Sequence, residues 1–133
     1  ASMSLQQEVF RACISLAEQM HLPLVVHAVK CTEELFRIHK ELKPQMPWII
    51  HGFRGRKEVA EQYLKRGFYL SFGEHFHDEA LRSTPLERLL LETDESRLSM
   101  EEICRKAASA YGLPAEILAA RITSNAQKVL FLQ

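Results

Sequence analysis

Two histidines and one aspartate have the residue types and positions expected of ligands for a divalent metal ion. His27 and His51 each follow a short apolar run, and Asp94 ends the leucine-rich run in "LERLLLETDESRL". A buried carboxylate is costly unless it has a partner, which gives Asp94 a reason to face a cation. Imidazole and carboxylate groups bind zinc, manganese or iron, and a carboxylate beside the ion can accept a proton from water. We therefore predict a metal site at His27, His51 and Asp94, with Asp94 also the candidate catalytic base.

Each of the three residues has a structural interpretation when it is taken alone. A histidine at the end of a strand commonly makes a structural hydrogen bond, and an aspartate is a suitable cap for a following segment. The metal hypothesis rests on the three together. Their predicted strands run parallel, and the carboxyl ends of parallel strands meet at one rim of the sheet.

The elements that would hold these residues are short apolar strands separated by helices. Strands are predicted at 23–27, 48–51, 68–72 and 88–93. Helices are predicted from Ser4, from Thr32 as an N-cap, and over "RKEVAEQYLKRG" as far as a glycine cap at Gly67. The connection to the fourth strand is broken by Pro85 and has room only for a short helix. This alternation predicts an α/β fold of parallel βα units.

Two further helical regions are predicted after the last strand. Ser99 and Glu102 have the spacing of a capping box, which predicts a helix that begins at residue 100. Pro114 and Ser124 are each expected to open another short helical segment. The aromatic residues of 63–72 fall at helix or strand positions, so we assign them to the core rather than to a platform for stacking bases.

Length and composition indicate one domain with no strong field of either sign. The chain has 133 residues, of which 47% are apolar, enough for one core over 1–133. Its 17 basic residues balance its 17 acidic residues, so any contact with nucleic acid must be local. The three cysteines lack C-x-x-C spacing, which suits a reducing cytoplasm. No apolar run approaches the ~18 residues of a membrane span, so we expect a cytoplasmic protein without membrane contact.

Four segments carry a resemblance to a known family. "LPLVVHA", "WIIHGFRGRKEVAEQYLKRGFYLSFG", "PLERLLLETDESRL" and "ITSNAQKVLF" resemble the later part of the TatD family of metal-dependent deoxyribonucleases, which are amidohydrolase-like TIM barrels. The resemblance runs from Ser4 to Phe131 and implies about half of a (β/α)8 barrel. It implies that His27 and His51 bind metal and that Asp94 is a ligand or the base.

The same resemblance implies a reaction, its cofactors and its substrate. Family members hydrolyse DNA phosphodiesters, often as 3′ exonucleases, so we expect single-stranded DNA or a 3′ end as the partner. The expected cofactors are magnesium, manganese or zinc, with two ions in the complete site. Such ions activate water and offset the charge on phosphate. Asn125 matches a recurrent family position, to which we assign a structural role.

Part of the family pattern is not matched. The family has an early His-x-His pair and a metal-bridging glutamate in a "G-E-x-G-L-D" type segment, and this chain shows neither. A complete barrel of this type needs about 250 residues, so we expect the N-terminal strands to precede Ala1 in a longer protein. The pair His75 and His77 sits in a polar loop and is assigned to the surface. Arg54 is a candidate contact for substrate phosphate, and a solvated loop charge is its alternative.

Two other functions are kept open. The chain could be a non-catalytic half-barrel, a binding or scaffold module that pairs in a homodimer to cover an exposed sheet edge. It could also belong to a metal enzyme that cleaves a different ester or amide, because this class of barrel supports both chemistries. An upstream strand ending in His-x-His, with a glutamate just before Ser4, would favour the nuclease.

Overall fold

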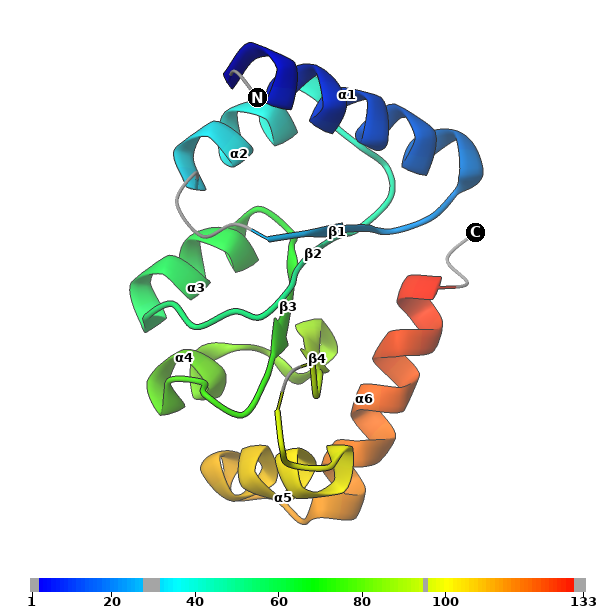
Figure 1. The fold of residues 1–133 in the computed structure, drawn as a ribbon. Coiled ribbons are helices and arrows are strands. Elements are labelled where there is room, and N and C mark those ends of the chain that lie inside the picture. Colours follow the sequence, from blue (N-terminus) through cyan, green and yellow to red (C-terminus); the bar gives the residue numbers. More distant parts are fainter. Residues whose placement is uncertain (1–2, 28–31, 95, 131–133) are drawn as a thin grey trace.

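The computed structural model describes residues 3–27, 32–94 and 96–130, and its centre is a sheet of four parallel strands. The strands lie side by side in chain order, as Figure 1 shows. They are β1 (Leu24–Val26), β2 (Trp48–Ile50), β3 (Tyr69–Phe72) and β4 (Leu89–Leu91). All four lie where the sequence predicts them, and the predicted parallel α/β arrangement is confirmed.

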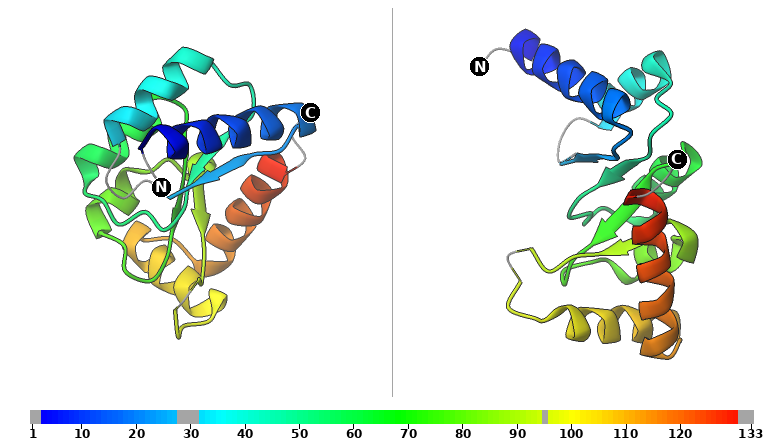
Figure 2. Two further views of the ribbon diagram at one scale, coloured as in Figure 1. Left: turned by 45° about the horizontal axis from the view of Figure 1, so that its top comes forward. Right: turned by 90° about the vertical axis from the view of Figure 1, so that its right-hand side faces the viewer.

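Helices connect the strands and lie beside the sheet. In chain order they are α1 (Met3–Met20), α2 (Thr32–Leu42), α3 (Lys57–Lys65), α4 (Asp78–Ser83), the single 3-10 turn η1 (Leu86–Arg88), α5 (Met100–Tyr111) and α6 (Ala115–Leu130). Helix α3 packs on α4, α4 on α5, and α5 on α6, while α1 contacts β1 and α6 contacts β4. The two views of Figure 2 show the resulting curved strip of βα units, with α1 and α6 beside its outer strands.

The register of the strands brings the residues that follow them to one rim. Val26 pairs with Ile50, and Phe72 pairs with Leu91. Backbone hydrogen bonds extend the pairing one step further, since the His51 N–H donates to the carbonyl of Val26 at 2.9 Å. The Glu92 N–H likewise donates to the carbonyl of Phe72 at 3.0 Å. Backbone hydrogen bonds therefore hold His51 and Glu92 against the neighbouring strands before the chain turns away from the sheet.

Aromatic side chains fill the space between the sheet and its helices. Trp48, Tyr63, Phe68 and Phe72 are almost fully buried. The rings of Trp48 and Phe68 meet edge to face with centroids 5.7 Å apart, the arrangement that aromatic pairs prefer. The assignment of Tyr63, Phe68 and Phe72 to the core is confirmed, whereas Tyr69 is only partly buried and has the Arg88 guanidinium over its ring.

The predicted ends of two helices are confirmed. The Ser99 hydroxyl accepts a hydrogen bond from the Glu102 N–H at 3.1 Å, and the Glu102 carboxylate accepts one from the Ser99 N–H at 3.2 Å. Gly67 follows α3 with φ of 87°, a backbone conformation that suits glycine.

Two predicted helix starts are wrong. No new segment opens at Ser124, because α6 is one continuous helix through that position. Serine favours the start of a helix, but tertiary contacts of the next residue outweigh that preference. The Asn125 amide donates to the carbonyl of Leu89 at 2.8 Å and also to that of Leu86. This contact bears out the structural role assigned to Asn125. Thr32 is the first residue of α2 rather than its cap, and its hydroxyl lies 3.2 Å from the Tyr63 hydroxyl.

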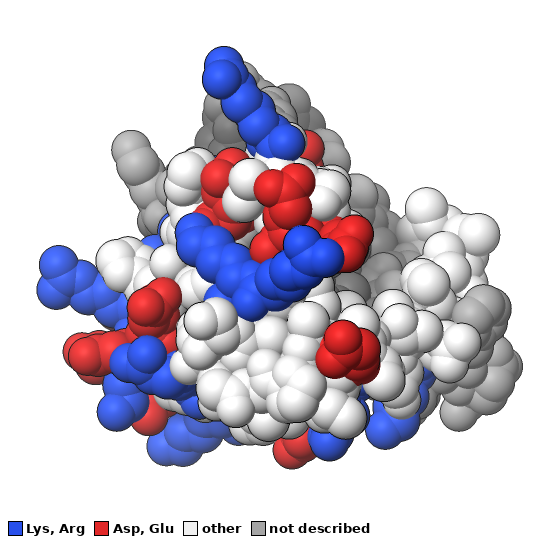
Figure 3. Space-filling model, turned by 90° about the horizontal axis from the view of Figure 1, so that it is seen from below, with Lys and Arg blue, Asp and Glu red and all other residues white. Residues whose placement is uncertain are grey.

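The outer parts of this strip expose apolar side chains. Val9, Leu16 and Met20 of α1, Val25 of β1 and Leu130 of α6 are each more than half exposed. Within the described residues β1 pairs only with β2, and β4 only with β3. The surface that Figure 3 views from below carries acidic and basic side chains side by side. In the described part of the chain, no helix is long and apolar enough to cross a membrane.

Candidate metal centre

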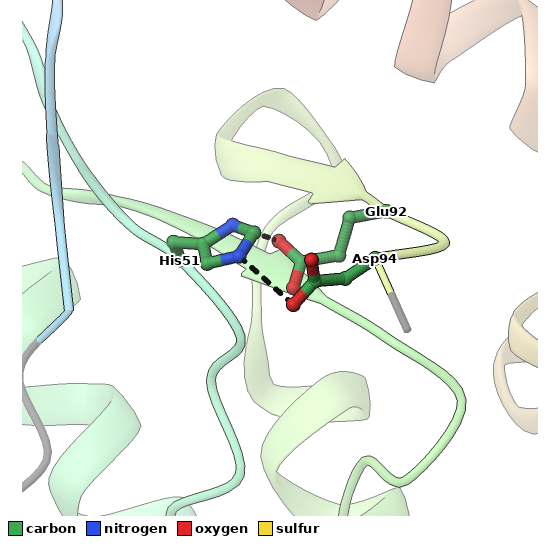
Figure 4. A group of neighbouring side chains, drawn as sticks. All are labelled: His51, Glu92 and Asp94. Carbon is green, nitrogen blue, oxygen red and sulfur yellow. Dashed lines mark hydrogen bonds and ion pairs between the residues drawn. The ribbon is translucent and has the colours of Figure 1, made fainter. Parts of the chain in front are cut away.

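Three side chains at the rim converge on one small volume. His51 follows β2, and Glu92 and Asp94 follow β4; one potential ligand atom from each lies within 4.8 Å of the other two. His51 Nδ1 is 2.7 Å from Glu92 Oε2, and His51 Nε2 is 3.3 Å from Asp94 Oδ2. Figure 4 shows the imidazole facing both carboxylates. The rim thus joins His51 and Asp94, as the sequence predicts.

Asp94 occupies a turn that points its carboxylate toward solvent. Its φ is 37°, in the left-handed region that few residues other than glycine enter. Aspartate is one of the residue types enriched there, because its short polar side chain tolerates the conformation. The side chain is 58% exposed, so an ion or a water molecule can reach it directly.

Glu92 is the site residue that the sequence analysis missed. Its side chain is only 13% exposed, and its Oε2 accepts a hydrogen bond from the buried Ser71 hydroxyl at 2.6 Å. A signal for it exists in the sequence. Residues two apart in an extended segment project to the same side, so Glu92 and Asp94 of "LLETD" were both eligible to face His51.

His27 lies beside this group without being part of it. Its ring centroid is 4.4 Å from that of His51, with the two planes at 79°. The structure therefore brings the two predicted histidines together at the ends of adjacent strands. The metal role of His27 stays a prediction, because the described residues that share a ligand-sized volume are His51, Glu92 and Asp94.

The other polar candidates lie on exposed loops. Arg54 is exposed in the segment between β2 and α3, and its contact with phosphate stays a prediction. His75 and His77 are exposed before α4, as expected for surface residues. The His75 side chain is 64% exposed, and its Nε2 is 3.7 Å from a carboxylate oxygen of Glu74.

The donor set fits a divalent cation. One imidazole nitrogen and one or two carboxylate oxygens suit zinc, manganese and magnesium. Two carboxylates close to a single histidine repel each other, and a bound cation offsets that repulsion. The three residues fill fewer positions than these ions take, which leaves room for water, for substrate and for further protein ligands.

Comparison with known proteins decides the family. Residues 1–131 match the sequence family described as TatD related DNase. The chain belongs to the TatD family. It is 39% identical over 98 residues to the uncharacterized metal-dependent hydrolase YabD of Bacillus subtilis, an alignment that covers 68% of this chain and 38% of that protein. It is 28% identical over 101 residues to Deoxyribonuclease Tat-D of Schizosaccharomyces pombe, covering 71% of this chain and 32% of the relative.

Solved structures of TatD proteins share the fold. A hydrolase TatD family protein from Entamoeba histolytica superposes with a TM-score of 0.85 at 18% identity, over 100% of this chain and 59% of that chain. The TatD homologue YJJV of Escherichia coli also gives 0.85, at 20% identity over 98% of this chain and 58% of its own. The predicted fold class, a partial TatD-type TIM barrel, is confirmed. The chain spans well under two thirds of each of these proteins.

Proposed function

We propose that this chain forms the later part of a divalent-metal-dependent phosphodiesterase that acts on DNA. The observation that carries the proposal is the meeting of His51 with Asp94 and Glu92 at the rim of the parallel sheet. Membership of the TatD family supports the reaction, and the name of the fission yeast relative supports DNA as the substrate.

The residues take distinct roles in this proposal. His51 Nε2 and Asp94 bind the ion, and His27 adds a ligand from the neighbouring strand. When bound, a divalent ion of magnesium, manganese or zinc polarises the phosphodiester and makes a water ligand more acidic, and two ions are proposed in the complete site. Asp94 accepts the proton of the attacking water, which its exposure allows. Arg54 pairs with a non-bridging phosphate oxygen.

The substrate we propose is single-stranded DNA or a 3′ end. The chain carries no net charge, so it lacks the broad positive field that holds long duplexes without sequence preference. A flexible strand can bring one phosphate to the rim without a large basic surface.

We propose that residues 1–133 are a single unit, the C-terminal part of a longer barrel. Support comes from the relatives, because this chain covers 38% of YabD and 59% of the Entamoeba chain. It also comes from the exposed apolar residues of α1 and β1, which preceding barrel strands and helices would cover. Those strands would supply the remaining metal ligands.

The same surface favours a second candidate, the non-catalytic half-barrel. Val9, Leu16 and Val25 are exposed beside the outer strand β1, and a second copy of the chain could bury them in a homodimer. Such a module would bind no metal at His51 with useful affinity and would cleave no DNA.

The test is a cleavage assay on the full-length protein with end-labelled single-stranded DNA and added Mg²⁺, Mn²⁺ or Zn²⁺. We expect release of nucleotides from the 3′ end and a loss of about 10²–10⁴-fold in rate for Asp94→Asn, which keeps the shape of the side chain but cannot act as a base. His51→Ala should remove metal binding and activity, with His75→Ala as the matched control. Cleavage of DNA at the wild-type rate by both Asp94→Asn and His51→Ala would refute the proposal.

A further inference from the structure

A relay of polar contacts, one hydrogen bond and one ion pair, crosses the ends of β3, β4 and β2. The Ser71 hydroxyl donates to Glu92 Oε2 at 2.6 Å, and the same oxygen lies 2.7 Å from His51 Nδ1. We infer that Ser71 and Glu92 are positioning residues that hold His51 with its proton on Nδ1 and its lone pair on Nε2. The inference rests on the metal role proposed for His51, and it gives Ser71 and Glu92 roles that the proposed function leaves unassigned.

The two carboxylate contacts of His51 differ in length, and the longer one, to Asp94, also meets the geometry of a hydrogen bond. Two ligand atoms that share one ion at about 2.1 Å lie roughly 3.0–3.4 Å apart in octahedral or tetrahedral geometry. The 3.3 Å between His51 Nε2 and Asp94 Oδ2 falls within that range. The 2.7 Å between His51 Nδ1 and Glu92 Oε2 is too short for two ligands of one ion and is the distance of a close ion pair.

The chemistry of imidazole then fixes the roles. The two ring nitrogens point apart, so one ion binds only one of them. A carboxylate at Nδ1 stabilises the N–H there, which leaves Nε2 unprotonated and able to bind metal. Glu92 thus acts on the metal through His51, while Asp94 faces it directly.

The surroundings of Glu92 show a side chain held in one place. It is 13% exposed, against 58% for Asp94, and its partner Ser71 is buried. A Cβ built on Gly52 would lie 3.3 Å from Glu92 Oε1, and one built on Gly73 would lie 3.8 Å from Glu92 Cγ. Gly52, after β2, therefore leaves space that this carboxylate occupies, whereas a Cβ at Gly73 would make only ordinary contact.

The direct test reads the ring of His51 in the metal-free protein. We would measure ¹⁵N chemical shifts of the histidine rings by NMR in the full-length protein, at a pH where these shifts themselves show the His51 ring to be neutral. The expected result is His51 as the Nδ1–H tautomer in the wild type, with a mixture of tautomers in Glu92→Ala. His51 as the Nε2–H tautomer in the wild type would overturn the inference, and this outcome needs no variant to fold.

A second measurement follows Zn²⁺ affinity by calorimetry. Removing an outer partner of a ligating histidine typically weakens metal binding by about 10–100-fold, which we expect for Ser71→Ala and Glu92→Gln. Ser83→Ala, which deletes a hydroxyl that bonds within α4, is the matched control and should bind Zn²⁺ normally. Ser71→Thr keeps the hydroxyl and should restore the affinity. Unchanged affinity in both Ser71→Ala and Glu92→Gln would overturn the relay.

A third measurement separates a positioning role for Glu92 from a direct one. The visible spectrum of the Co²⁺-loaded protein reports the number and type of ligands, and it should be the same in Glu92→Gln as in the wild type. A spectrum that shows one oxygen ligand fewer would make Glu92 a ligand and refute the positioning role. Failure of the proposed function looks different, because the tautomer and the Zn²⁺ results would hold while the wild type cleaved no DNA.

Discussion

Gly52 offers a sharp test of the packing around Glu92. Its φ is 65°, where an alanine is strained, and an added Cβ would meet Glu92 Oε1 at 3.3 Å. Gly112 provides the matched control, because its φ is 75° and a Cβ there meets nothing within 4 Å. The two alanine variants therefore share the backbone strain and differ in the contact with the carboxylate.

The expected losses in stability and in Zn²⁺ affinity follow from the backbone strain and from the contact with Glu92. A left-handed backbone conformation costs alanine roughly 1–2 kcal/mol. This cost is partly offset because alanine, compared with glycine, lowers the conformational entropy of the unfolded chain. We expect Gly52→Ala and Gly112→Ala each to lower the free energy of unfolding by about 1 kcal/mol. Only Gly52→Ala must move Glu92, by a few tenths of an ångström, so only that variant should bind Zn²⁺ more weakly, by roughly 10-fold.

The assay combines urea unfolding of the metal-free proteins with calorimetric titration of Zn²⁺. Unfolding measures the shared strain, and the titration isolates the contact with Glu92. If Gly52→Ala bound Zn²⁺ like the wild type, or if Gly112→Ala lost as much affinity, the account of Glu92 as a carboxylate held in place for His51 would be refuted.

Three further predictions concern other parts of the molecule. Asn125→Ala leaves two backbone carbonyls without its amide and should lower the free energy of unfolding by about 2–4 kcal/mol, measured in urea. Burial, and to a smaller extent the nearby Arg66, lowers the pKa of His39, so the folded state favours the neutral ring. The free energy of unfolding should therefore fall as the pH drops below the ordinary pKa of about 6.5. His39→Phe should flatten that fall in urea titrations at several pH values. Adding Mn²⁺ at about 100 times its dissociation constant should raise the free energy of unfolding of the wild type by about 2.7 kcal/mol. The control Asp78→Asn should gain as much, and Asp94→Asn should gain much less. Equal gains in all three proteins would contradict the ligand assignment.

Much of the fold could be predicted from the sequence, because its elements are locally consistent. The runs before His51 and Asp94 are apolar and flanked by helices, so strands of a parallel sheet follow from composition and spacing alone. The general rule that such sheets gather reactive groups at their carboxyl ends then placed His27, His51 and Asp94 at one rim. The break predicted at Ser124 failed because tertiary contacts of the next residue outweigh a weak local preference.

The finer part of the site could not be predicted, because it depends on register and on single side-chain directions. Ser71 meets Glu92 only because Phe72 pairs with Leu91, and a shift of one residue would turn Ser71 to the other face of the sheet. Glu92 lies beside His51 Nδ1 and Asp94 beside Nε2, with Asp94 at a positive φ and Glu92 close to Gly52. Neither feature is encoded in a local pattern of residue types.

The ion can be located directly in a crystal structure of the full-length protein grown with Mn²⁺, by anomalous scattering. We predict an anomalous peak within bonding distance of His51 Nε2 and an Asp94 carboxylate oxygen, with Glu92 still beside His51 Nδ1. An anomalous peak at the exposed pair His75 and His77, or no peak beside His51, would contradict this prediction.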